Sequence, residues 1–204
     1  MGGPDPAFNP RLVAAIANAK RGALAKSSIE SAIAQGQGKT TSGVALESVT
    51  IEAMLPFSVG AVIECQTDSK MRTIQDVRAI ISRRGGSITP TGFLFERKGK
   101  AVFEKKDALS VDAVLDQAIE AGATDVDVEH DGSLVVETEP SDLSAVTQRL
   151  SESLGLKVES LNIIHDPRED TMVVLEEEEM ADLEHLVAQL EEDPAVLDVY
   201  VNAA

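Results

Sequence analysis

The residues of this sequence whose type and spacing suit a chemical task are basic, and they gather in its first hundred positions. Binding of phosphate groups needs several cations on one face, because each neutralised phosphate releases counterions and adds affinity. We predict that the following lysines and arginines contact nucleic acid: Lys20, Arg21, Lys26, Lys70, Arg72, Arg78, Arg83, Arg84, Arg97 and Lys98.

The charge of the chain is divided unevenly between its two halves. Residues 1–100 hold 13 of the 18 lysines and arginines and 8 of the 35 acidic residues, whereas residues 101–204 hold the other 5 and 27, which gives the net charge of −17. One half can therefore face an anion while the other repels it. Because aromatic residues make up only 3% of the chain, we expect backbone or shape contacts rather than base stacking. The acidic half is expected to face solvent or a basic protein.

The basic residues also have a simpler interpretation. Arg83 and Arg84 close a predicted helix, as Lys20 and Arg21 close another, and cations at these ends complement the helix dipole. On the predicted helix at 72–84, Arg72 and Arg83 share a face because eleven residues make three turns, while Arg78 points elsewhere.

Other kinds of site are not predicted. Gly36-Gln-Gly-Lys-Thr-Thr41 resembles the end of a phosphate-binding loop, but Ile33 occupies the position of the first required glycine, so the segment is interpreted as a linker. The histidines lie in three different elements without the spacing of metal ligands. No nucleophile is paired with a base. We therefore predict no enzyme, no cofactor and no metal. The apolar stretches are too short to span a membrane, so no membrane partner is expected.

The elements that position the basic residues change type along the chain. Asn9-Pro10 starts a helix that runs to about Lys20, and Ser27-x-x-Glu30 is a possible capping box for a second helix that stops at Gly36. These form a predicted helical domain, 1–43, with a thin core. Strands at 49–55 and 59–67, a helix at 72–84 and a strand at 92–97 then form an α/β unit.

The next segment has the predicted order βαββαβ, which is typical of a ferredoxin-like domain. Its strands are expected at 101–105, 125–130, 134–138 and 157–163, and its helices at 111–121 and 142–154, with Asp131-Gly132 as a hairpin turn. A strand at 171–175, a helix at 176–192 and a strand at 196–201 are too few for a further domain. The predicted α/β domain is therefore discontinuous, 44–100 plus 165–204, and the ferredoxin-like domain, 101–164, is inserted into it.

Several segments, in order along nearly the whole chain, resemble the YebC family. The resemblance rests on Asn9-Pro-Arg-Leu12, Ile29–Gly36 with a second glycine at 38, Glu64–Thr73, Val77-Arg78, Gly85-Gly86, Phe95–Gly99, Ala118–Ala123 and Val199–Asn202. It implies an α+β protein of three domains, namely a helical bundle, an α/β domain and an inserted ferredoxin-like domain.

The resemblance also implies a function. Bacterial members of the family are described as DNA-binding transcription regulators or ribosome-associated translation factors, mitochondrial members resemble the translational activator of cytochrome c oxidase subunit I, and neither group is enzymatic. We expect a translational activator that binds RNA or the ribosome in the mitochondrial matrix. The alternative is a DNA-binding transcriptional regulator, with a cytoplasmic location as the alternative to the matrix.

The sequence departs from the family pattern at three places. The basic segment containing Ser-Lys-Trp, with which the family begins, is absent before Met1, so the chain is expected to be truncated at its N-terminus. A Tyr-x-x-Tyr-Gly-Pro-Gly-Gly turn is replaced by Ile51–Gly60, and Asn-x-Asn-Arg-Thr by Ser69-Lys-Met-Arg-Thr73. The two replacements suggest a divergent, fungal and mitochondrial branch.

Overall fold

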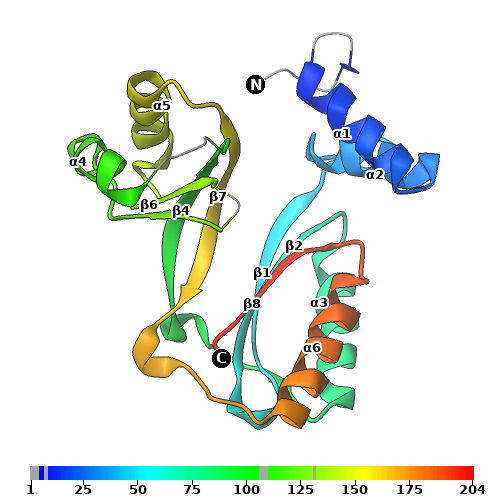
Figure 1. The fold of residues 1–204 in the computed structure, drawn as a ribbon. Helices are drawn as coiled ribbons and strands as arrows, with labels where there is room; N and C mark the ends of the chain where they lie inside the picture. Colours follow the sequence, from blue (N-terminus) through cyan, green and yellow to red (C-terminus); the bar gives the residue numbers. More distant parts are fainter. Residues whose placement is uncertain (1–4, 7–8, 106–109, 131) are drawn as a thin grey trace. The chain divides into compact units, whose positions relative to one another are not determined.

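The computed structural model describes residues 5–6, 9–105, 110–130 and 132–204, and it is an α+β fold with N-terminal helices and two four-stranded antiparallel sheets (Figure 1). By compactness the chain divides into two units. The first unit is Met1–Thr91 with Val174–Ala203, and the second unit is centred on Gly92–Val173. None of the described helices is long and apolar enough to cross a membrane.

The N-terminal helices of the first unit are α1 (Pro10–Arg21) and α2 (Lys26–Gln35). The Asn9 side chain accepts a hydrogen bond of 3.1 Å from the backbone N–H of Leu12, as the predicted helix start requires. The capping box predicted at Ser27 is wrong, because α2 begins one residue earlier and its cap, Ala25, makes no side-chain hydrogen bond. Glu30 instead forms an ion pair of 3.5 Å with Lys26.

The first sheet has the strand order β3-β1-β2-β8, from β1 (Glu47–Met54), β2 (Gly60–Thr67), β3 (Ser87–Ile88) and β8 (Val196–Val201). Helices α3 (Lys70–Arg83) and α6 (Glu177–Glu191) lie side by side against it (Figure 1). The core of this layer is fully buried and apolar, since branched strand residues pack well against a helix stripe. It includes Ile63, Val77, Ile81, Leu186 and Leu190.

The turn between β1 and β2 has an unusual backbone. It contains the 3-10 turn η2 (Pro56–Ser58), and both Phe57 and Ser58 have positive φ, +62° and +63°. This left-handed region favours glycine, because a Cβ atom there crowds the following carbonyl. The chain therefore adopts this conformation with two residues that carry a Cβ atom.

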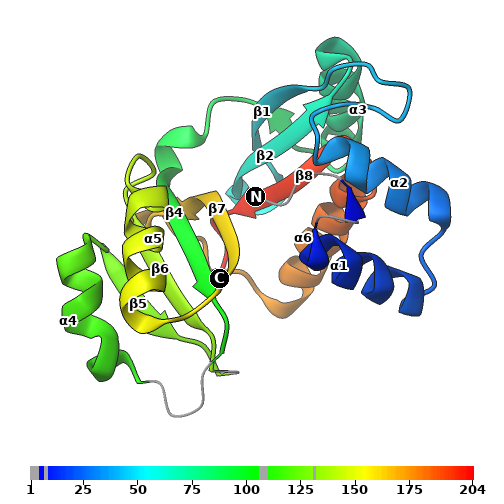
Figure 2. The same ribbon diagram turned by 90° about the horizontal axis from the view of Figure 1, so that it is seen from above.

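The second sheet has the order β5-β6-β4-β7 and contains β4 (Phe95–Phe103), β5 (Asp125–Val128), β6 (Leu134–Thr138) and β7 (Val158–Pro167). Helices α4 (Val111–Ala121) and α5 (Leu143–Leu154) lie on one side of it (Figures 1 and 2). Its core is a single apolar cluster that includes Ala101, Phe103, Leu134, Val136 and Leu150. The order of these elements is the predicted βαββαβ.

Three predicted strands differ from the structure. The strands expected at 92–97 and 101–105 form one strand, β4, which follows the 3-10 turn η3 (Gly92–Leu94). Charged residues on both sides of Gly99 interrupt the apolar pattern, so the sequence does not predict one continuous strand. In the structure Gly99 and Ala101 face the same core. The strand expected at 171–175 is not formed. There the 3-10 turn η4 (Glu169–Thr171) intervenes, because the Thr171 hydroxyl donates to backbone carbonyls of Leu94 and Arg168.

Candidate nucleic-acid interface

The predicted basic residues are distributed over both units. Arg97 and Lys98 lie in the second unit, and all the other candidates lie in the first. The two groups are therefore considered separately. In the first unit the candidates occupy the end of α1, the start of α2, and α3 with its C-cap.

Helix α3 exposes its arginines on the side away from the sheet. Thr73, Val77 and Ile81 are its buried residues, and the Thr73 hydroxyl donates to Thr67 Oγ1 at 2.9 Å, which fixes the first turn of the helix on the end of β2. Arg72 and Arg83 are about 20° apart around the helix axis and about 16 Å apart along it. The predicted shared face is thus present on α3.

Ion pairs divide the cations of α3 into two groups. Arg72 pairs with Asp68, and Lys70 Nζ lies 2.8 Å from Glu47 Oε2. Arg78, Arg83 and Arg84 are exposed and form no ion pair with any residue that the structure describes. Arg78 and Arg83 on α3 and Arg84 at its C-cap are therefore available to an anion from outside, and Arg78 lies about 140° around the helix axis from Arg83.

The neighbouring helix α6 carries the opposite charge. It opens with Glu176–Glu179 in a capping box, and residues 174–203 contain no lysine or arginine. Asp182 of α6 and Arg84 line a small cavity of about 90 Å³ together with Phe57. The acidic helix repels phosphate, so an anion is expected to approach α3 from the side away from α6.

Two other basic candidates of the first unit, Arg21 and Lys26, are less available. The Arg21 guanidinium donates to the Asn18 side chain within the last turn of α1, and Lys26 is paired with Glu30. Lys20 and Arg21 lie in that last turn, where the helix dipole favours cations. The simpler interpretation accounts for this pair and equally for Arg83 and Arg84 at the end of α3, and Lys20 is exposed without an ion pair among the described residues.

In the second unit Lys98 is held by two carboxylates on neighbouring strands. Its ammonium lies 2.9 Å from Glu137 of β6 and 2.7 Å from Asp166 of β7. These hydrogen bonds, to Asp166 first and then Glu137, raise the pKa of Lys98 although partial burial opposes the change. Lys98 thus joins three strands of the sheet, β4, β6 and β7. Arg97 points to the other face of the sheet, because side chains alternate along a strand.

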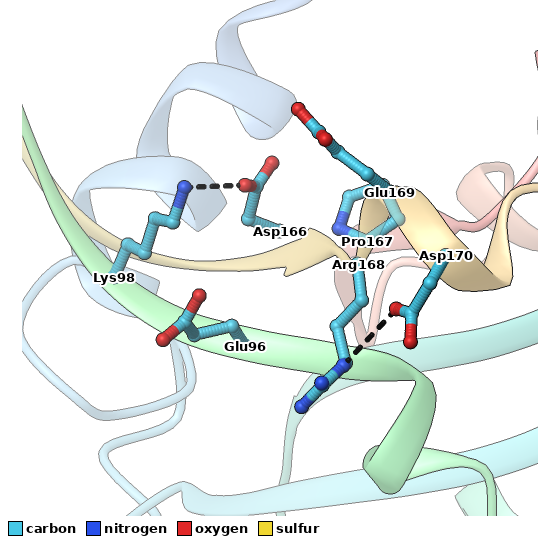
Figure 3. Close-up of a pocket in the computed structure, with 7 residues that line it drawn as sticks. All are labelled: Glu96, Lys98, Asp166, Pro167, Arg168, Glu169 and Asp170. Atoms are coloured by element: carbon cyan, nitrogen blue, oxygen red, sulfur yellow. Dashed lines mark hydrogen bonds and ion pairs between the residues drawn. The ribbon is translucent and has the colours of Figure 1, made fainter. Parts of the chain in front are cut away.

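A groove of about 790 Å³ lies beside Lys98 (Figure 3). Figure 3 shows Lys98 directed toward Asp166 and Arg168 directed toward Asp170, and the charged groups that lie outside these two pairs are carboxylates. Glu96 and Glu169 complete the charged lining. The groove therefore has an excess of negative charge and is unsuited to phosphate.

An acidic pair on the first sheet was not anticipated from the sequence. Glu64 of β2 lies directly opposite Asp198 of β8, next to a β-bulge. Partial burial, and then the charge of Glu64, raise the pKa of Asp198, and burial with both carboxylates raises the pKa of Tyr200 to about 12. Cross-strand register, which the sequence does not contain explicitly, brings these residues together.

Replacing Asp198 with asparagine is expected to stabilise the protein by about 0.5 kcal/mol at pH 7, because like charges directly opposite each other destabilise a strand pair. The native state holds the Asp198 proton more tightly than the unfolded state, so ionisation destabilises it. The advantage of Asp198→Asn should shrink as the pH falls through the raised pKa toward 3.8. Urea unfolding at several pH values measures this. The control is Asp116→Asn on α4, where equal stabilisation would contradict the prediction.

Comparison with known proteins gives the family. The model of the second and third domains of TACO1/YebC proteins matches residues 46–203, and the model of their N-terminal domain matches residues 1–39. The chain belongs to the TACO1/YebC family. The resemblance seen in the sequence is confirmed.

Two relatives of the chain are bacterial proteins. It is 37% identical to proteins from Persephonella marina and Aeromonas salmonicida, each called a "Probable transcriptional regulatory protein", over 99% and 100% of this chain and 80% and 81% of theirs. The crystal structure of a conserved hypothetical protein from Aquifex aeolicus is 33% identical, with a TM-score of 0.69, over all of this chain and 83% of that one.

Two features of the TACO1/YebC pattern can now be placed on the fold. Ser69–Thr73, which replaces Asn-x-Asn-Arg-Thr, caps and opens α3, and the retained Thr73 and Arg72 bond to residues just before the helix. Gly85-Gly86 closes the same helix. The family pattern thus brackets the helix that carries the exposed arginines.

Proposed function

We propose that this chain is a non-enzymatic regulator of gene expression that binds nucleic acid through Arg78, Arg83 and Arg84 of α3. The supporting observation is that these three exposed cations lack an ion-pair partner among the described residues, whereas Arg72, Lys70 and Lys98 have one. The acidic surface elsewhere repels phosphate, so the arginines set the orientation in which the chain approaches.

The proposed target is duplex DNA. The names of two relatives support transcriptional regulation over the translational activity expected from the sequence, and their bacterial origin supports action in the cytoplasm over the mitochondrial matrix. Arginines on an exposed helix suit contacts with a phosphate backbone. RNA or the ribosome is the second candidate, favoured by the acidic second half of the chain, which could face basic ribosomal proteins.

We also propose the domain organisation expected from the sequence, in which a ferredoxin-like domain, 101–164, is inserted between 44–100 and 165–204, after a helical domain, 1–43. β4 and β7 pair along their whole length, so the sheet of the ferredoxin-like domain continues beyond residues 101–164 at both ends of that range. In this organisation the arginine helix α3 belongs to the interrupted domain.

Replacing Arg78, Arg83 and Arg84 with alanine is expected to weaken binding to duplex DNA about a hundredfold at low salt, because charge-assisted contacts to phosphate are lost. The slope of log affinity against log salt concentration should become shallower by about three. Fluorescence anisotropy with labelled duplexes over a salt series measures both quantities.

The matched control is the triple variant Arg72→Ala, Lys157→Ala and Arg168→Ala, which removes the same charge from cations that are already ion-paired. This variant should keep most of the affinity and slope. Equal losses in both variants would contradict a defined arginine site. Salt-sensitive co-sedimentation with ribosomes, without binding to duplex DNA, would replace the DNA proposal with the translational one.

A further inference from the structure

The outer edge of β7 is the least protected strand edge of the two sheets. Exposed edges invite pairing with another chain unless they are short or charged. β3 has only two residues, β5 has four and carries Asp125 and Asp127, and β8 has Asp198 near its middle. β7 is the longest edge strand, with ten residues, and its centre, Ser160-Leu-Asn-Ile-Ile164, contains no charge.

The apolar side chains of this segment are exposed. Leu161 and Ile163 are paired with Ala101 and Gly99 of β4, on the face that carries the helices, yet they remain 39% and 38% exposed. Helices α4 and α5 cover β4 and β6 more fully than they cover β7. A strand laid along the outer edge would bury these two side chains and satisfy the backbone groups of β7 at the same time.

The sequence of the edge is complementary to itself. In an antiparallel pair of two β7 strands centred on Asn162, Leu161 of one copy lies opposite Ile163 of the other, and Ser160 lies opposite Ile164. The two-fold symmetry repeats both contacts. Asn162 lies opposite its own copy, where the two amides can hydrogen-bond each other. No like charges meet in this register. Just outside it, Glu159 at the β-bulge and Asp166 limit the pairing to the central residues.

We propose that two copies of the chain associate through β7, so that their second sheets join into one continuous antiparallel sheet across a two-fold axis at Asn162. A two-fold interface uses the same surface of both subunits, which is what a self-complementary strand provides. This surface contains none of the arginines of α3, so the inference goes beyond the proposed function and does not depend on it.

The dependence on salt separates this association from nucleic-acid binding. Each copy carries a net charge of −17, so the two copies repel each other at long range, and added salt screens the repulsion. Dimerisation is therefore expected to strengthen as salt is added. Binding to phosphates weakens under the same change.

Disulfide cross-linking of the full chain tests the register. Directly opposite residues of an antiparallel pair have Cα atoms about 4.5 to 5.5 Å apart, within the range of a disulfide. Asn162→Cys should therefore form a covalent dimer under mild oxidation, whereas Gln117→Cys, exposed on α4, should not. The native Cys65 is buried and does not interfere. Equal cross-linking of the two variants would overturn the proposed register.

Sedimentation equilibrium of the chain, over a range of concentrations, tests the association itself. The Leu161→Lys/Ile163→Lys variant should raise the dimer dissociation constant at least about a hundredfold, because it removes buried apolar surface and adds an edge charge. The matched variant Leu115→Lys/Ile119→Lys alters side chains that are also exposed, on α4, and should leave the constant unchanged. A wild-type chain that stays monomeric at every concentration and salt level would overturn the proposal.

Discussion

Replacing Gly86 with alanine is expected to lower the free energy of unfolding by about 3 kcal/mol, since overpacking of a filled site is strongly destabilising. A Cβ atom on Gly86 would lie 2.7 Å from the Met54 backbone oxygen, 2.7 Å from the Ile81 side chain and 3.2 Å from Leu55 Cα. The backbone atoms cannot move aside cheaply. Urea unfolding of the full chain, followed by circular dichroism, measures the change.

The neighbouring Gly85 provides the control. It has a φ of +86°, but a Cβ atom there would meet nothing within 4 Å. Gly85→Ala should therefore cost only the strain of the left-handed conformation, about 1 kcal/mol. Equal losses at the two glycines would show that close packing at Gly86 is not the cause. Because Gly86 lies two residues after Arg84, Gly86→Ala is also expected to weaken the proposed DNA binding.

The helices of this chain could be predicted from the sequence because their apolar residues recur at helical spacing. The buried residues Val77 and Ile81 of α3, and Val114 and Ala118 of α4, are the positions that this spacing selects. The ends of helices are less predictable. The possible capping box at Ser27 failed because the helix begins at Lys26, so that its cap is Ala25, two residues before Ser27 and without a side chain that can accept a hydrogen bond.

Strands were predicted less well where polar residues interrupt them or tertiary contacts end them. β4 runs through Lys98-Gly-Lys100, and Gly99 is required there because a Cβ atom would lie 2.6 Å from Thr138 Oγ1 and 2.8 Å from Leu143 Cβ. The two-residue β3 was missed because it has no pattern of its own. Its pairing with Met54 and Ala53 of β1 depends on the fold.

The sequence predicted which residue types form the candidate site, but not which of the basic side chains remain available to an outside ligand. Lys98 and Arg83 look equivalent in the sequence, yet Lys98 is bound to Glu137, 39 residues further along the chain. Strand register decides such pairs. Register also creates the opposed carboxylates of Glu64 and Asp198. The sequence therefore supplies the cations, and the fold selects which of them an outside ligand can reach.

Replacing Phe57 and Ser58 together with glycine is expected to raise the free energy of unfolding by about 2 kcal/mol. Each residue has positive φ, which costs about 1 to 2 kcal/mol for a residue with a Cβ atom. Glycine relieves this strain, but its greater freedom in the unfolded chain offsets part of the stabilisation. Urea unfolding of the double and single variants measures the gain.

Alanine variants separate backbone strain from side-chain loss in this turn. Ser58→Ala keeps the Cβ atom and should give no gain, and Phe57→Ala should remove the side chain while keeping the strain. If Ser58→Ala raised the free energy of unfolding as much as Ser58→Gly, backbone strain would not explain the stabilisation. Phe57 is 38% exposed and lines the small cavity with Arg84. If Phe57→Ala and Phe57→Gly weaken DNA binding while Ser58→Gly does not, then the Phe57 side chain acts on binding through Arg84, with which it shares this cavity.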